Sequence, residues 1–464
     1  MERVNVTRIE LGVAGVGVML ASLLGLPQVR AQEASAEDEG NVPDAQSEPT
    51  ETVAETDDAP AVGAETGDAS VEGAEAGDAP VEGAETGEAD SAAEATEGEE
   101  ERAPYTFFGY AETEYSFNFN EPSNGITHLR GFDNRHNTFT IQNVALGVTW
   151  DWENVVGNVT LQVGHTGATY YLAETSLVGA LGTNASSASL WQFVQQANVG
   201  YRIGVGNGLT VSAGLFLSPI GIEGMGVRDN WNWSRSNLFF GCPFYHTGIR
   251  LSYPLDDHWT VTLAGFNGWN TVVDNNDEKS IAAQLTYTDP SLAVSVLYFT
   301  GVERPTGAPE GRPWRHLFDA HVTWHTTEWL SLALHVDGGL EPNAFGTSGW
   351  FASAAYARFR ILPELFVAAR GDVFLESAAR NATGTASTIF WPARADGRDQ
   401  WVSSGTLTLE VRPVDHILFR LEYRHDHAAS DVFFGGTVPT DAMGQAVMSR
   451  AAQDTVTAGA TAWF

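Results

Sequence analysis

An alternation of apolar and polar residues with a period of two runs through most of the sequence beyond residue 103, and it constrains the fold most strongly. Near the C-terminus, for example, Phe419, Leu421 and Tyr423 alternate with Arg420 and Glu422. Successive side chains of a β-strand point to opposite faces of the sheet, so such strands have one apolar face and one that carries full charges. The pattern predicts an all-β fold in which the charged faces meet water.

The alternation predicts sixteen strands, and the lengths of their connections show a second regularity. The predicted strands are residues 105–119, 136–150, 157–171, 190–203, 208–217, 245–253, 259–268, 279–288, 292–300, 315–326, 329–338, 349–360, 364–375, 402–412, 416–425 and 452–464. Short turns, such as 254–258 and 413–415, alternate with long loops, such as 218–244 and 426–451. A soluble β-sandwich also alternates in polarity, but this asymmetry of connections is typical of outer-membrane barrels. We predict a transmembrane antiparallel β-barrel of about 16 strands, with both termini in the periplasm.

The end of the chain indicates the same class of protein. Val456, Ala458, Ala460 and Ala462 share one face of a last strand, and the final residue is Phe464. A terminal aromatic residue behind such an alternation resembles the signal that the outer-membrane barrel assembly machinery reads. Aromatic residues near many strand ends also suit the two interfacial girdles of a barrel. We expect this machinery as a partner, outer-membrane lipid around the barrel, and the bacterial outer membrane as the location.

The predicted barrel spans residues 104–464, and residues 1–31 are predicted to be a signal peptide. Arg3 and Arg8 precede an apolar run from Leu11 to Leu26, and a small residue precedes the expected cleavage after Ala31. A membrane anchor is the alternative, but the run is shorter than the roughly 20 residues that span a bilayer, and no basic stop-transfer cluster follows it.

Residues 32–103 are predicted to form a disordered acidic low-complexity segment in the periplasm. From Glu33 to Glu101 there are 24 acidic residues, no basic or aromatic residue, and three near-copies of a ten-residue unit rich in Ala, Glu and Gly. This composition cannot build a hydrophobic core, so much of the formal charge of −35 belongs to a tail. A solvated spacer and a segment that binds cations or a basic partner are both compatible with it.

Several short motifs resemble those of the OmpL-like family of β-barrel porins. They are residues 230–237 (NWNWSRSN), 243–253 (PFYHTGIRLSY), 267–270 (NGWN), 274–280 (DNNDEKS), 107–110 (FFGY) and 118–122 (NFNEP). The resemblance covers roughly residues 105–464 and is most specific in the central block. It implies an outer-membrane porin and supplies no solute. The long acidic repeat departs from the family.

A barrel of this size is wide enough to leave an aqueous channel, and charged residues are expected to line it. An arginine or lysine that faces lipid near the midplane costs about 2–4 kcal/mol, so a charged strand face should point into the lumen. The expected pore-lining residues are Glu112, Glu114, Arg202, Arg250, Arg358, Arg360, Arg370, Asp372, Glu410, Arg412, Arg420, Glu422 and Arg424. The alternative is a ladder of mutually neutralising charges that braces the wall. Mixed signs favour weak ion selectivity.

The third long loop, residues 218–244, is the candidate constriction, because in porins of this size this loop commonly folds inward. Its candidate residues are Arg228, Asp229, Trp231, Trp233 and Arg235, with Arg228 and Arg235 foremost. The Ser-Arg-Ser sequence within the loop is equally compatible with anchoring it to the barrel wall.

Histidines raise the question of a metal site. His321 and His325 share a predicted strand face with Asp319, and His335 lies with Asp337 on the next strand. Alternate positions on paired strands can converge on a metal. No cysteine or tight carboxylate set accompanies these residues in the sequence, so no metal and no cofactor are expected.

The sequence favours no enzymatic activity and no nucleic-acid partner. G-x-S-x-G, H-E-x-x-H and glycine-rich phosphate-loop motifs do not occur, so no catalytic residues are assigned. The single cysteine, Cys242, cannot form an intramolecular disulfide. The acidic balance argues against binding to nucleic acid.

Two functions from different classes remain. The favoured one is a porin that forms a water-filled channel for diffusion of small hydrophilic solutes or ions, with uptake of an anion such as phosphate as a refinement. The alternative is a structural or adhesive outer-membrane barrel without open-channel activity. Homotrimer formation is a further expectation from the resemblance, although a monomer is also compatible with the sequence.

Overall fold

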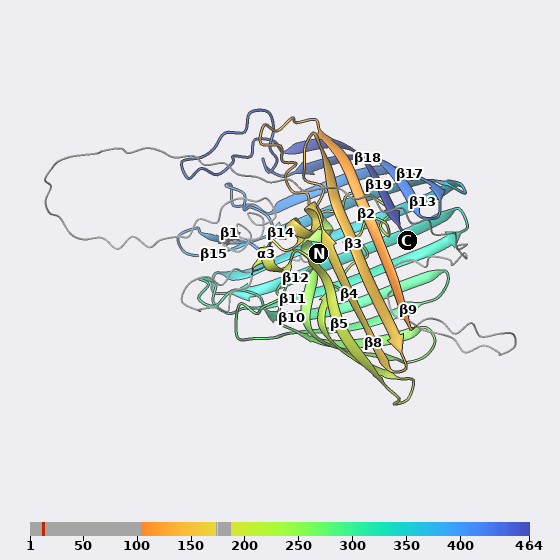
Figure 1. Cartoon of the computed structure of the whole chain (residues 1–464). Helices are drawn as coiled ribbons and strands as arrows, with labels where there is room; N and C mark the ends of the chain where they lie inside the picture. Colours follow the sequence, from red (N-terminus) through yellow and green to blue (C-terminus); the bar gives the residue numbers. More distant parts are fainter. Residues whose placement is uncertain (1–11, 14–103, 173, 175–186) are drawn as a thin grey trace, which may run out of the picture. The chain divides into compact units, whose positions relative to one another are not determined.

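The computed structural model describes residues 12–13, 104–172, 174 and 187–464, and these contain a closed barrel of 16 antiparallel strands. The predicted fold class is thereby confirmed. The predicted disordered segment, residues 32–103, lies outside the described residues. In Figure 1 the tilted strands lie side by side around the barrel, with the first strand beside the last.

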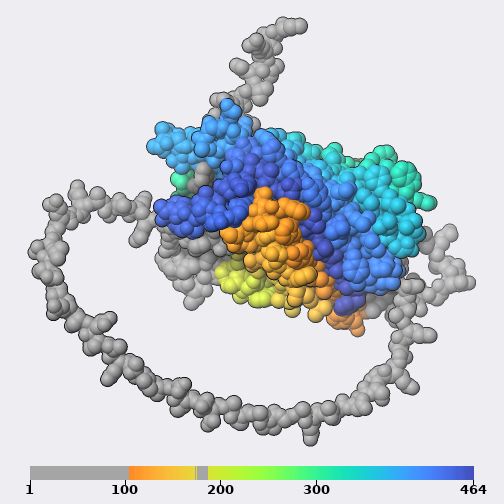
Figure 2. Space-filling view, turned by 90° about the horizontal axis from the view of Figure 1, so that it is seen from above, coloured from red at the N-terminus to blue at the C-terminus, as the bar shows by residue number. Residues whose placement is uncertain are grey.

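The barrel strands follow one another around the wall in chain order, as in an up-and-down barrel. They are β2 (Tyr105–Asn118), β3 (Thr138–Trp152), β4 (Val155–Val163), β5 (Val194–Ile203), β6 (Leu209–Leu217), β7 (Tyr245–Pro254), β8 (Trp259–Phe266), β9 (Ser280–Thr288), β10 (Leu292–Val302), β11 (Trp314–Thr327), β12 (Leu330–Asn343), β13 (Gly346–Leu362), β14 (Leu365–Ser377), β17 (Gln400–Val414), β18 (Ile417–Ala428) and β19 (Ala452–Trp463). Pairing of β19 with β2, from Trp463 opposite Tyr110 to Thr455 opposite Asn118, closes the barrel. Figure 2 shows the orange surface of the first strands against the blue surface of the last.

The remaining elements are short and do not form part of the barrel wall. They are α2 (His165–Tyr170), α3 (Ala188–Trp191), the 3-10 helix η1 (Leu238–Gly241), β15 (Ala379–Arg380), β16 (Ala386–Ser387) and β1 (Gly12–Val13). The last three form a small separate sheet in the order β1-β16-β15. Within the described ranges, no helix is long and apolar enough to cross a membrane.

Burial along the strands is inverted relative to a soluble protein. In β18 the outward residues Phe419 and Leu421 are exposed, whereas the inward residues Arg420, Glu422 and Arg424 are buried. Exposed apolar side chains need a non-aqueous surrounding, and charged side chains need partners or water. The barrel therefore presents an apolar outer face that suits lipid and a polar interior.

Connections alternate in length as predicted, with one exception. The turns at one end have two to five residues, and the loops at the other have 11 to 30, except for residues 344–345 between β12 and β13. The sequence predicted a break at 339–348 here. Continuous pairing from Gly339 opposite Trp350 to Asn343 opposite Gly346 instead extends both strands into a long hairpin.

Two predicted strand boundaries were wrong. The predicted strand 157–171 ends at Val163, where Gly164 has a φ of 137° and α2 begins. The predicted strand 190–203 begins only at Val194, because α3 occupies its first residues. Both errors fall in aromatic stretches whose apolar spacing fits a short helix as well as a strand.

Candidate functional site

The long connection between β6 and β7, residues 218–244, lies inside the barrel, and we call it the inserted loop. Every residue from 232 to 246 is buried, including η1. Side chains that project inward from the barrel strands hold this loop, for example Thr408 of β17, which accepts a hydrogen bond from Asn232 Nδ2 at 2.7 Å. The lumen is therefore occupied on this side by ordered protein.

Inward carboxylates accept hydrogen bonds from the backbone of the inserted loop. Glu422 accepts from the amides of Trp233 (2.6 Å) and Ser234 (3.0 Å). Asp372 accepts from the amide and the Nδ2 of Asn237, at 3.0 and 2.8 Å. A loop that does not form a strand or a long helix leaves many amides without partners, and these carboxylates satisfy them.

Inward arginines donate to the carbonyl groups of the same loop. Arg420 donates to Val227 O at 2.7 Å and also to Asn230 O. Arg370 donates to Ser234 O and forms an ion pair of 2.8 Å with Glu223, which belongs to the loop. Arginine suits this task because its guanidinium offers five donors in a fixed geometry.

Carboxylates of the wall therefore bind the amides of the loop, and arginines of the wall bind its carbonyl groups. Hydrogen bonds to charged groups contribute about 1.5–3 kcal/mol each when their partners are well placed. Opposite charges also alternate along the wall, as in the pair of Arg420 Nη2 and Glu410 Oε2 at 2.6 Å. Burial of these charges is thus compensated by partners in the wall and in the loop.

Trp233 joins three strands at once. Its indole Nε1 donates to Glu114 of β2, and its amide donates to Glu422 of β18. The ring lies over Gly459 of β19, where an added Cβ would be only 2.4 Å from the ring atom Cη2. Glycine is therefore needed at residue 459 so that the ring can lie against the strand.

The five candidate constriction residues divide into two groups. Arg235 is buried, donates to Gly224 O at 3.2 Å, and lies 4.9 Å above the centre of the Phe132 ring. Arg228 is partly exposed and pairs with Asp229 at 3.0 Å. Trp231 is partly buried and packs edge-on against Tyr356 of β13, and the buried Trp233 is placed as described above. Arg235 is thus part of the internal structure of the loop, whereas Arg228 keeps part of its side chain exposed.

The comparison with protein families decides the assignment. The family described as "Putative beta-barrel porin-2, OmpL-like" matches residues 104–464. The chain belongs to this family. Membership identifies the protein as an outer-membrane porin and places it in the bacterial outer membrane. No curated protein matches the chain.

Solved structures of other outer-membrane proteins are similar to this porin over most of their length. An anion-selective porin from Comamonas acidovorans has 13% identity and a TM-score of 0.49, covering 78% of this chain and 99% of that one. The outer-membrane channel DcaP of Acinetobacter baumannii has 11% identity and a TM-score of 0.49, covering 78% and 97%. OmpT of Vibrio cholerae has 11% identity and a TM-score of 0.48, covering 78% and 97%.

The expected pore-lining residues of the porin also divide into two groups. Those under the inserted loop are buried: Glu112, Glu114, Arg370, Asp372, Glu410, Arg420, Glu422 and Arg424. Those that keep some exposure are all arginines: Arg202, Arg250, Arg358, Arg360 and Arg412. Opposite charges face each other across neighbouring strands here, as where Glu410 of β17 lies opposite Arg420 of β18.

The exposed arginines lie toward the end of the barrel that carries the short turns. Arg358 lies 4.1 Å above the ring centre of Phe366, which sits beside the β13–β14 turn. Arg360 and Arg412 approach the same ring at 5.9 and 5.8 Å. Glu410 is the carboxylate that pairs with Arg358 and Arg412.

Sequence reasoning missed several residues that hold the loop. Glu223 bonds both Arg370 and the amide of Ser236, and Gly459 makes room for Trp233. Arg130 holds the connection after β2, not the inserted loop, to the wall, because it pairs with Asp426 of β18 at 3.0 Å. None of these residues belongs to a recognisable sequence motif, because the role of each depends on which strand lies opposite it in the folded barrel.

Proposed function

We propose that this porin is a diffusion channel for small hydrophilic solutes and ions, in which the inserted loop forms the constriction. The observation that carries the proposal is the attachment of this loop to the inner faces of β2, β14 and β18 by charged side chains. A loop held this firmly sets a fixed lumen width, and solutes pass beside it.

We further propose a modest preference for anions. The carboxylates of the wall are used by the loop, whereas side chains such as Arg202, Arg358 and Arg412 keep 36, 20 and 32% of their surface exposed. Positive side chains that remain in contact with lumen water raise the local concentration of anions. Pairing with Asp151 and Glu410 keeps the preference weak.

The finer organisation of the chain is also part of the proposal. We propose that residues 1–31 are removed as a signal peptide and that residues 32–103 extend into the periplasm, because an even number of strands leaves both ends of the barrel on that side. The barrel assembly machinery is the proposed assembly partner, a homotrimer the proposed oligomer, and enzymatic activity is not part of the proposed function.

Single-channel recording in planar bilayers tests the proposal with the full chain purified from outer membranes. We expect stepwise conductance. Glu422→Gln should give a noisier and larger conductance, because the loss of one charge weakens the acceptor of two loop amides. Glu364→Gln, on an exposed turn, is the matched control and should behave like the parent protein.

A second variant tests the acidic segment. Deletion of residues 33–101 should change the conductance only if this segment reaches the periplasmic mouth. A folded barrel that inserts and carries no current would contradict the channel function and support the structural or adhesive alternative.

A further inference from the structure

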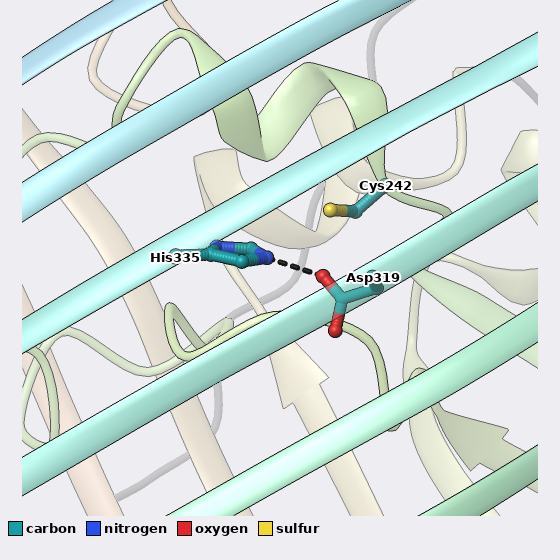
Figure 3. Close-up of side chains that lie close together, drawn as sticks. All are labelled: Cys242, Asp319 and His335. Atoms are coloured by element: carbon teal, nitrogen blue, oxygen red, sulfur yellow. Dashed lines mark hydrogen bonds and ion pairs between the residues drawn. The ribbon is translucent and has the colours of Figure 1, made fainter.

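Three side chains with different metal-binding atoms converge inside the barrel. Asp319 lies on β11, His335 on the neighbouring β12, and Cys242 follows η1 at the end of the inserted loop. One sulfur, nitrogen or oxygen atom of each lies within 4.8 Å of those of the other two. Figure 3 shows the three side chains pointing toward one another.

The cluster is fully enclosed and is surrounded by further polar groups. Cys242, Asp319 and His335 are each at most 2% exposed. His335 Nε2 bonds Asp319, and Cys242 Sγ lies 3.3 Å from the Oδ2 of Asp337. His321 Nδ1 lies 3.2 Å from the other oxygen of Asp319. Asp337 is thus the nearest additional ligand, and His321 is placed to orient the carboxylate of Asp319.

Two buried carboxylates face each other at this position, and histidines pair with Asp319. Asp319 and Asp337 lie directly opposite each other in the β11–β12 pairing, and both are buried. Asp319 has His335 and His321 as partners, whereas among the described residues no basic side chain forms an ion pair with Asp337. Like charges opposite each other on paired strands destabilise the sheet, and burial raises the cost. Elsewhere in this lumen, buried carboxylates such as Glu422 and Asp372 face arginines or loop amides.

We propose that Cys242, Asp319 and His335 bind a zinc ion, with Asp337 as the nearest group to complete the coordination. Thiolate, imidazole and carboxylate are the ligand types of zinc sites, with bonds of about 2.0–2.3 Å. Tetrahedral ligands at such bond lengths are about 3.3–3.8 Å apart, so separations of up to 4.8 Å require only small side-chain adjustments. Calcium and magnesium prefer sites built from oxygen atoms, and the thiolate disfavours both.

The site could not be found from the sequence, where the absence of a cysteine near these histidines argued against a metal. Four barrel strands, β7 to β10, separate Cys242 from the strand of Asp319 along the chain. Only the inward course of the inserted loop brings its sulfur to the β11–β12 wall. The zinc ion would therefore connect the end of the inserted loop to the wall.

Metal binding is tested on the full chain, purified from outer membranes in detergent, stripped with a chelator, reloaded with Zn²⁺ and freed of excess metal. We expect one tightly bound Zn²⁺ per chain by elemental analysis. Substitution with Co²⁺ should produce a thiolate-to-cobalt charge-transfer band, which can only come from Cys242 because the chain has one cysteine. This band also separates the site from weak binding by the acidic N-terminal segment.

Variants assign the ligands. Cys242→Ser and His335→Gln should each weaken zinc binding at least tenfold, and Cys242→Ser should abolish the cobalt band. His325→Gln is the control and should bind as the parent does, because His325 lies on the same face of β11 and its imidazole bonds Ser331. Heat-modifiable migration on gels verifies that each barrel is folded.

Two results would overturn the proposal without any variant: a folded parent protein that holds no stoichiometric zinc at micromolar concentration, or one that binds cobalt without a charge-transfer band. Unchanged zinc affinity in folded Cys242→Ser would do the same. These measurements do not use conductance, so they succeed or fail independently of the proposed channel function.

Discussion

Gly459 shows how a single residue controls the position of the inserted loop. Its missing side chain leaves room for the ring of Trp233. We expect Gly459→Ala to lower the free energy of unfolding by about 1–3 kcal/mol, because an added Cβ overlaps a ring that is also bonded through its Nε1 and its amide. Guanidinium unfolding of the detergent-solubilised barrel measures the change.

Gly405→Ala on β17 is the matched control for this prediction. An added Cβ at Gly405 meets no atom within 4 Å, so this variant should unfold as the parent does. Equal stability of both variants would show that the Trp233 ring can move away from β19 without cost.

At the same scale, the sequence predicted which way charged side chains point but not what covers them. The period of two places Arg420, Glu422 and Arg424 on one face of a strand, and the structure has all three facing inward. Whether such residues line water or a protein segment depends on the course of residues 218–244. That course depends on contacts between residues far apart in the chain, such as Glu422 with Trp233.

At the scale of elements, the strands were predictable. A strand that faces lipid on one side and polar groups on the other must alternate apolar and polar residues. The loops were not predictable. They hold one another by single contacts, as where His128, after β2, packs against Phe434 and bonds Val432 O in the connection before β19. Such contacts leave no periodic pattern in the sequence.

This contact between connections should weaken in acid. Burial lowers the pKa of His128 to about 4, and burial likewise lowers the pKa of His165, which bonds Asn134 of the same connection, to about 4. A histidine that leaves its buried site takes up a proton near pH 6.5. Its contribution to the stability of the contact is therefore complete above that pH and is lost as pH falls toward 4. The loss is about 1.4 kcal/mol per pH unit for each proton.

A spin label at exposed residue 443, introduced by Met443→Cys, reports the mobility of the connection before β19. We expect mobility to increase between pH 6.5 and 4 in this protein and to change much less when His128→Gln and His165→Gln are added. Constant mobility over this range in the labelled parent would contradict the prediction.

For the whole porin, the asymmetry of exposed charge predicts ion selectivity. Replacing Arg358 and Arg360 by Gln should lower the ratio of anion to cation permeability roughly twofold, which corresponds to about 0.4 kcal/mol of screened electrostatic energy. Reversal potentials in a salt gradient measure this ratio.

Arg380→Gln is the control for selectivity, because Arg380 lies in the connection between β14 and β17 at the opposite end of the barrel. It should leave the ratio unchanged. Selectivity that stays the same in the double variant would mean that ions do not pass close to the arginines around Phe366.

The contacts of Trp233 have a consequence for how the barrel is completed during folding. Its indole bonds β2, the first strand, while its ring covers β19, the last, and these two strands meet only when the chain closes on itself. The tryptophan therefore bridges the two strands at the closure of the barrel. Docking of the loop and joining of the chain ends therefore stabilise each other, and an open barrel lacks a complete binding place for the inserted loop.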